Sequence, residues 1–90
     1  MNDYEAMGTR TARSPLGVHL DWACISITED EAEFRMPFHE HNVTGGNMVH
    51  GGAIAALADA VATAACWATE KASPTSRGAT ISLNINYVKA

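Results

Sequence analysis

The sequence predicts an α+β protein in which antiparallel strands pack against one long, buried helix. Residues 17–27 and 32–38 show the alternation of apolar and polar side chains that is typical of half-buried strands. The run from His50 to Lys71 is rich in alanine and apolar around the whole helix cylinder, which indicates a helix buried on most sides. A further alternating segment, residues 80–88, follows the helix, so the predicted order is β-β-α-β.

Composition and charge narrow the functional classes. Ninety residues allow one domain, and 47% hydrophobic against 18% charged residues is typical of a soluble globular chain. A net charge of −4 without a run of Lys or Arg argues against nucleic acid as the main partner. The start lacks the apolar stretch of a signal peptide, and Asp59 interrupts the most apolar segment, so we predict a cytoplasmic protein without a membrane span. Cys24 and Cys66 lie in apolar runs and are expected to be buried free thiols.

The predicted hairpin consists of two alternating segments joined by a turn at residues 28–31. The alternation that begins at Val18 slips near Cys24, which indicates either a β-bulge or burial on both faces of the strand. In the second segment the apolar residues occupy every second position and share one face: Ala32, Phe34, Met36 and Phe38.

The helix is expected to pack closely against the sheet. Ten of the residues between Ala53 and Ala72 are alanine, the best helix former and small enough for close approach. Residues 39–47 before it form a predicted loop, and Pro74 and Gly78 are predicted to end it.

The domain organisation predicted from the sequence is a flexible N-terminal segment, residues 1–14, followed by a domain over residues 15–90. Three strands are a thin cover for a buried helix. We therefore expect that further strands are missing at the C-terminus, or that a partner completes the sheet.

The candidate site begins at "HGG", residues 50–52, and includes Asp59, a lone carboxylate among small apolar residues. A helix N-terminus presents unpaired N–H groups, and the side-chain-free Gly51 and Gly52 leave room for a carbonyl oxygen to be polarised there. Asp59 lies eight residues further along, about 12 Å at 1.5 Å per residue. One carbonyl cannot reach both groups of the same helix, so a shared substrate requires two protomers.

The stretch "VHGGAIAALADAVATAA" and the later "TISLNINY" resemble the hotdog-fold acyl-CoA thioesterases of the phenylacetate-degradation type, over residues 14–90. The resemblance implies a hotdog fold, in which a curved antiparallel sheet wraps a long central helix, with its C-terminal strands missing here. It implies hydrolysis of an acyl-CoA or aryl-CoA to free acid and CoA, without a cofactor. It also implies a homodimer joined sheet to sheet, with a homotetramer left open.

The resemblance also implies roles for residues of this chain. Gly51 is the implied oxyanion donor, and Asp59 is the carboxylate that attacks or activates water across the dimer interface. Thr80 is the implied hydroxyl that positions the water or the carboxylate. His50 and Gly52 are implied to contribute to substrate binding at the start of the helix, where His50 orients the preceding loop.

An amide in the preceding loop is implied to hold the thioester. Asn42 is the preferred candidate for this role, with Thr44 and Asn47 as alternatives. A metal site is not predicted, because His39, His41 and His50 are not accompanied by a recognisable ligand pattern.

Two other functions stay open. One is a hotdog domain that binds acyl-CoA without turnover, which would have no need of Asp59. The other is a hydratase or dehydratase, which would need a His and a carboxylate close together, whereas His50 and Asp59 are far apart on one helix.

Overall fold

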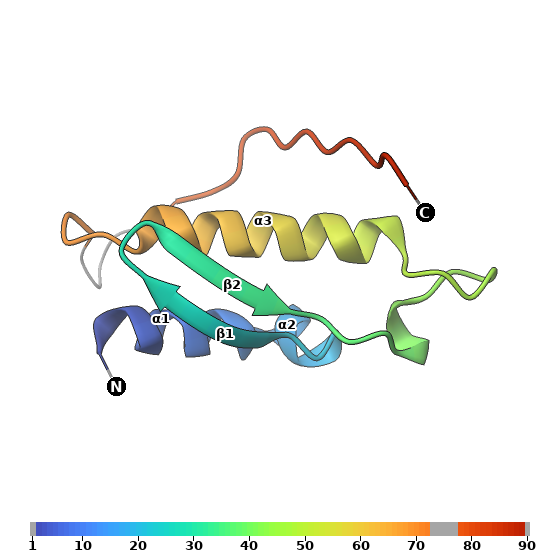
Figure 1. Cartoon of the computed structure of the whole chain (residues 1–90), viewed down its shortest axis with the longest axis horizontal. Helices are drawn as coiled ribbons and strands as arrows, with labels where there is room; N and C mark the ends of the chain where they lie inside the picture. Colours follow the sequence, from blue (N-terminus) through green and yellow to red (C-terminus); the bar gives the residue numbers. More distant parts are fainter. Residues whose placement is uncertain (1, 73–77, 90) are drawn as a thin grey trace.

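The computed structural model describes residues 2–72 and 78–89 and confirms the α+β class (Figure 1). Helices α1 and α3 lie side by side on one face of a two-stranded antiparallel sheet, and residues 78–89 run along the opposite side of α3. The elements in chain order are α1 (Asp3–Ala12), α2 (Pro15–His19), β1 (Ala23–Thr28), β2 (Glu31–Arg35), the 3₁₀ helix η1 (Glu40–Asn42) and α3 (Gly51–Trp67).

The predicted hairpin is formed, but β2 ends at Arg35, before the predicted end at Phe38, which is exposed. Strands β1 and β2 pair from Thr28 opposite Glu31 to Ala23 opposite Arg35, and the register shifts between Cys24 and Ser26, which confirms the β-bulge rather than burial on both faces. One face of the hairpin packs on the helices and the other is exposed. The inward residues are Cys24, Ile27, Ala32 and Phe34.

The N-terminal segment, for which the sequence predicted no regular structure, contains helix α1 over residues 3–12. The Asn2 side chain caps this helix by accepting a hydrogen bond from Glu5 N–H at 2.8 Å. The helix packs closely on β1 at Gly8, where an added Cβ would lie 2.5 Å from Cys24 Sγ. The domain boundary predicted after residue 14 stays a prediction.

The first strand starts later than predicted. Residues from Pro15 to His19 form the short helix α2, whose cap is Ser14 Oγ, which accepts from Gly17 N–H at 3.3 Å. Proline at the first helical position and serine before it favour this turn of helix over the strand. Val18 is therefore exposed on α2, and Trp22 just before β1 reaches the core.

Helix α3 ends at Trp67 and not at Lys71. The Ala68 carbonyl, just beyond the helix, accepts a 2.7 Å hydrogen bond from Asp30 N–H in the hairpin turn. Ala68 itself is fully buried, and this contact gives a partner to a carbonyl that has none within the helix. The stop predicted at Pro74 lies outside the described residues.

The core is built from small side chains of α3 against larger ones from the other elements. One cluster joins Ala53 to Ala12, Leu20 and Trp22, and a second joins Ala64 and Ala68 to Ile27. The remaining faces of α3 are half-buried or exposed, with Ile54 37% exposed, so the expected burial on most sides is wrong. None of the helices in the described residues has the length and apolar character needed to cross a bilayer.

The two cysteines differ from the prediction and from each other. Both are free, but Cys66 is exposed on α3, whereas Cys24 is partly buried under α1. Burial raises the pKa of the Cys24 thiol, which disfavours its reactive thiolate.

The predicted third strand is not formed in the described residues 78–89, which run as an irregular segment beside α3 (Figure 1). The hairpin lies on the other side of α3, so this segment has no neighbouring strand with which to build a ladder. The alternating apolar residues of this segment therefore do not form the buried face of a strand, and Ile81 is fully exposed.

Candidate functional site

The N-terminus of α3 presents one open backbone donor. His50 is the N-cap residue, and its Nδ1 accepts a 2.8 Å hydrogen bond from Gly52 N–H. Gly51 is the first helical residue, and its N–H has no acceptor among the described residues. The cap therefore occupies the Gly52 donor and leaves the Gly51 donor available to a ligand, at the positive end of the helix dipole.

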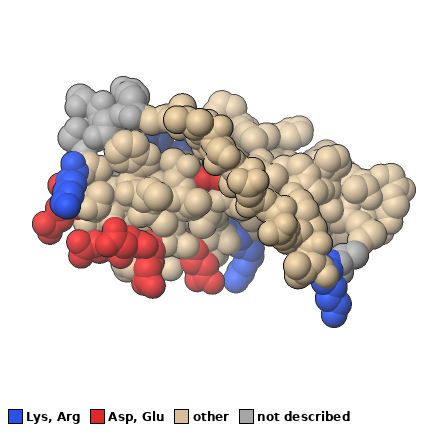
Figure 2. Space-filling model, turned by 90° about the horizontal axis from the view of Figure 1, so that it is seen from above, with Lys and Arg blue, Asp and Glu red and all other residues tan. Residues whose placement is uncertain are grey.

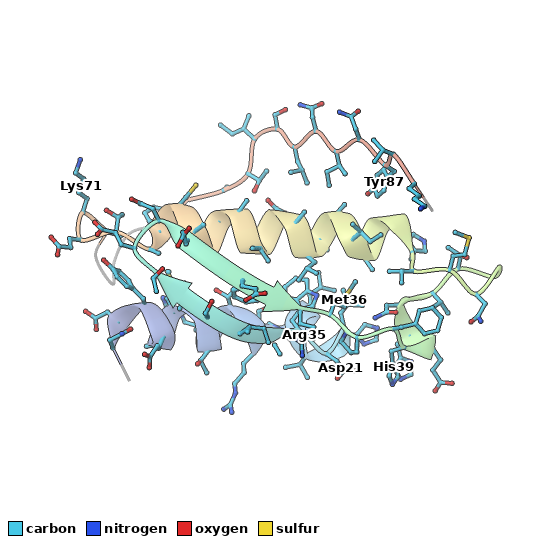
Figure 3. The ribbon with its side chains drawn as sticks, viewed as in Figure 1. Asp21, Arg35, Met36, His39, Lys71 and Tyr87 are labelled. Atoms are coloured by element: carbon cyan, nitrogen blue, oxygen red, sulfur yellow. The ribbon has the colours of Figure 1, made fainter. Side chains whose placement is uncertain are left out.

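Tyr87 ties the C-terminal segment to this helix start. Its hydroxyl donates a 2.7 Å hydrogen bond to the Gly51 carbonyl. Figure 3 shows the Tyr87 side chain beside the start of α3. A Cβ at Gly51 would lie 3.8 Å from the Tyr87 ring, which is an ordinary van der Waals contact, so the approach of Tyr87 does not itself require glycine at this position. This contact could not be predicted from the sequence, in which Tyr87 is one residue of an alternating pattern.

The structure brings together two residues of the predicted site, Asp59 and Thr80. Thr80 Oγ1 donates a 2.6 Å hydrogen bond to Asp59 Oδ1. Asp59 projects from the middle of α3 and is partly buried, whereas Thr80 lies on the exposed segment that crosses it. The hydrogen bond orients the carboxylate and leaves its second oxygen able to accept a proton.

Asp59 and Thr80 line an open hollow of about 930 Å³, here called the larger cavity. Its other walls come from the C-terminal half of α3, from α1 and from the segment after residue 77. Seen from the side of residues 78–89, the surface is mostly uncharged and acidic side chains gather along one edge (Figure 2). The larger cavity is thus large enough for a small organic group, with Asp59 as the one carboxylate among its described lining residues.

The Gly51 donor and the Asp59 carboxylate occupy separate places within one chain. Both belong to α3, eight residues apart, which corresponds to about 12 Å along the axis. The irregular segment contacts both places, through Tyr87 at Gly51 and through Thr80 at Asp59. The chain alone does not bring the two groups to one point.

Asn42 is buried and makes hydrogen bonds that stabilise the loop before α3. It is 2% exposed, its Nδ2 donates to the Pro37 carbonyl at 2.7 Å, and its Oδ1 accepts from His39 N–H at 3.1 Å. Its own carbonyl accepts from His50 N–H at 2.7 Å. Asn42 therefore holds the loop and the residue that caps α3.

The other two candidate residues of the loop, Thr44 and Asn47, differ in whether their side chains make hydrogen bonds within the loop. Thr44 Oγ1 accepts hydrogen bonds from Gly46 N–H at 3.1 Å and Met48 N–H at 3.4 Å, and so shapes the turn. Asn47 has a φ of 61° in that turn and is exposed, and its side-chain amide makes no hydrogen bond to a described residue. Of the two asparagines in the loop, Asn42 uses its side-chain amide within the protein, and Asn47 has an amide that is open to a ligand.

The histidines of the loop interact with one another. The rings of His39 and His41 are 4.4 Å apart, and His41 also stacks on His19 of α2 at 6.0 Å between ring centroids. In residues 2–72 and 78–89, no group of three or more His, Cys, Asp or Glu side chains is arranged to hold a metal ion.

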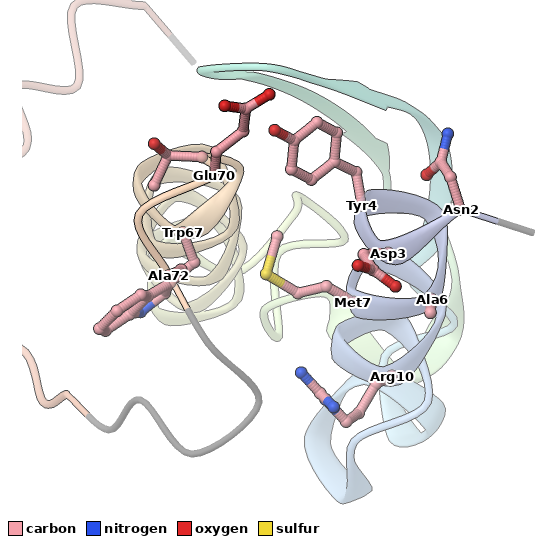
Figure 4. A pocket seen from close by; sticks show the side chains of 10 residues that line it. Asn2, Asp3, Tyr4, Ala6, Met7, Arg10, Trp67, Glu70 and Ala72 are labelled. Carbon is pink, nitrogen blue, oxygen red and sulfur yellow. The ribbon is translucent and has the colours of Figure 1, made fainter.

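A second hollow, here called the smaller cavity, lies between α1 and the C-terminal end of α3 (Figure 4). It has a volume of about 550 Å³ and is lined by Tyr4, Arg10, Trp67 and Glu70 among others. Desolvation raises the pKa of the Tyr4 phenol, and nearby carboxylates, Glu29 first and then Glu70, add to the shift. This site was missed from the sequence because α1 was not predicted.

Comparison with known protein families now gives the class to which this fold and site belong. The model of the thioesterase superfamily matches residues 46–90, which is 45 of the 90 residues and includes Gly51, Asp59 and Thr80. The chain therefore belongs to the thioesterase superfamily. Membership implies thioester hydrolysis, and a CoA thioester as substrate, in general terms. Neither the curated proteins nor the solved structures include a match to the chain.

Proposed function

We propose that this protein is an acyl-CoA thioesterase of the phenylacetate-degradation type, which hydrolyses an acyl-CoA or aryl-CoA to the free acid and CoA. The observation that carries the proposal is the 2.6 Å hydrogen bond from Thr80 to Asp59 beside an open cavity. Both residues lie within the segment that matches the superfamily. A thioester suits so small a set of groups, because its thiolate leaves without strong acid assistance.

In the proposed reaction the thioester carbonyl lies at the Gly51 N–H, where the helix dipole stabilises the oxyanion. The Asp59 carboxylate takes a proton from water as the water oxygen adds to the carbonyl carbon. The carbon–sulfur bond then breaks, and the CoA thiolate takes up a proton to give the free thiol. Direct attack by Asp59 is the alternative, with an anhydride that water then hydrolyses.

The proposed active unit is a homodimer with the hotdog arrangement, because one helix keeps Gly51 and Asp59 about 12 Å apart. Each site then takes Gly51 from one protomer and Asp59 from its partner. Mixing two inactive variants, Asp59→Asn and Gly51→Pro, tests this under conditions that exchange subunits. Proline removes the N–H and suits the first position of a helix after His50, whose ψ of 129° is extended. Recovered activity supports the shared site, and none contradicts it.

The residues around the helix mouth have supporting roles in this proposal. The open amide of Asn47 holds the thioester, and the Thr44 hydroxyl keeps that turn in shape. Asn42 acts through the loop that it holds, and His50 with Gly52 forms the cap that leaves the Gly51 donor free. The proposed location of the enzyme is the cytoplasm.

A panel of acyl-CoA substrates tests the proposed activity. Short-chain, medium-chain and aryl-CoA thioesters are incubated with the full chain, and released thiol and free acid are measured. We expect equal amounts of thiol and acid from at least one substrate. Tight binding without release would favour the non-catalytic binding domain. Hydration of an enoyl-CoA without thiol release would favour a hydratase.

A further inference from the structure

We propose that Arg10 of α1 binds an anionic oxygen group of the substrate in the larger cavity, so that α1 is part of the substrate site. The inference rests on the proposed function for the identity of the ligand, a CoA thioester. It extends the site to a part of the chain outside residues 46–90, the range that matches the superfamily.

Arg10 is placed between the two cavities. It lines the larger cavity together with Asp59 and Thr80, and it also lines the smaller cavity. In Figure 4 its side chain points away from α1 toward the side of α3. Arg10 is the basic residue that both cavities share, and their described lining residues include no other.

The guanidinium of Arg10 is free to bind a ligand. It has no hydrogen-bond or ion-pair partner among residues 2–72 and 78–89. A guanidinium carries five N–H donors in a planar fork that matches a carboxylate or a phosphate. In a chain with a net charge of −4, such a group also offsets the repulsion that an anionic substrate would meet near Asp59.

Charge decides which of the two cavities takes the anion. The smaller cavity is lined by the carboxylates of Asp3 and Glu70. The pKa of Tyr4 there is raised by desolvation first and then by nearby carboxylates, Glu29 and Glu70 among them. The larger cavity has Asp59 as its one described carboxylate, and Thr80 already donates a hydrogen bond to it. The anion therefore lies on the side of Arg10 that faces the larger cavity.

Two parts of the substrate offer this chemistry. One is a phosphate of CoA, and the other is a carboxylate at the far end of a dicarboxylic acyl chain. Both bind a guanidinium through paired charge-assisted hydrogen bonds. The Arg10 variants separate these two sources when they are measured with more than one ligand.

The test uses the full chain with Arg10→Gln and Arg10→Lys, and with Arg13→Gln as the matched control. Arg13 is an exposed arginine at the end of the same helix and lines neither cavity. Binding of CoA is measured by calorimetry, and KM and kcat are measured with one monocarboxylic and one dicarboxylic acyl-CoA. Thermal unfolding of each variant shows that it is folded.

We expect Arg10→Gln to weaken binding or raise KM about 10-fold or more, with kcat little changed, since a charge-assisted hydrogen bond is lost. Arg10→Lys recovers part of the loss, and Arg13→Gln behaves as wild type. A loss with CoA itself that disappears with uncharged pantetheine identifies the phosphate. A loss confined to the dicarboxylic substrate identifies the acyl carboxylate.

The proposal is overturned if Arg10→Gln and Arg13→Gln match wild type with every ligand, or if the wild-type chain binds none of them. Failure of the proposed function looks different. In that case CoA still binds in an Arg10-dependent manner, but no thioester is hydrolysed.

Discussion

Thr80 Oγ1 lies 2.6 Å from Asp59 Oδ1 and donates a hydrogen bond that joins two residues 21 positions apart in the chain. The carboxylate comes from the middle of α3, and the hydroxyl comes from the segment that crosses this helix on the side away from the hairpin. The contact fixes one carboxylate oxygen and leaves the other for a proton. It is the relationship on which the proposed chemistry depends.

Removing the Thr80 hydroxyl should slow turnover. Thr80→Val keeps the shape of the side chain but loses the hydrogen bond. We expect kcat to fall about 3- to 10-fold, which corresponds to the free energy that one hydrogen bond contributes. Thr80→Ser restores the hydroxyl and should recover most of the activity. Thr63→Val, which alters another hydroxyl of the larger cavity, is the control. Equal rates for Thr80→Val and wild type would remove Thr80 from the mechanism.

The cap at His50 should contribute to stability. His50→Ala removes the acceptor for Gly52 N–H, and we expect a loss of about 1 kcal/mol in the free energy of unfolding by urea. His50→Asn supplies another capping acceptor and should lose much less. A stability of His50→Ala equal to that of His50→Asn would show that the cap contributes little.

The close packing of α1 on β1 should not tolerate a methyl group. Gly8→Ala places a Cβ 2.5 Å from Cys24 Sγ, so we expect a loss of about 1–3 kcal/mol in the free energy of unfolding. In Gly45→Ala the added Cβ meets nothing within 4 Å, which makes it the matched control. If both variants unfold at the same urea concentration, α1 does not pack on β1 as described.

Local patterns predicted the parts of the fold that local physics decides. The hairpin with its irregularity near Cys24 follows from alternation, and the start of α3, predicted at His50, lies one residue away at Gly51.

Helix α1 was missed because its buried residues, Gly8 and Ala12, are small and give only a weak apolar signal. Tyr4 and Met7, which also pack against the core, lie at helical spacing from them and are the signal that could have revealed it. Ser14 was passed over as the capping residue that makes the following turn helical.

Contacts between distant segments account for the remaining differences. The carbonyl just beyond the end of α3 pairs with the Asp30 N–H, a contact that no pattern near Ala68 reveals. Residues 80–88 alternate as a strand does, but a strand forms only beside another strand.

For the candidate site too, the sequence predicted some of the residues, whereas the contacts between them came from the structure. A resemblance in sequence named Gly51, Asp59 and Thr80, and the structure adds how Thr80 meets Asp59. Residue spacing alone could not give that contact, nor the one between Tyr87 and Gly51, because both join segments far apart in sequence. Arg10 was missed because its helix was not predicted.

The central claim is that the Asp59 carboxylate performs thioester hydrolysis, and kcat/KM of Asp59→Asn for a hydrolysed acyl-CoA tests it most directly. Asp21→Asn is the matched control, since Asp21 is exposed and its φ of 59° suits asparagine equally well. We expect Asp59→Asn to lose about 100-fold or more in kcat/KM while its unfolding stays cooperative, and Asp21→Asn to keep wild-type activity. An Asp59→Asn protein that hydrolyses the substrate as fast as the Asp21→Asn control would contradict the account.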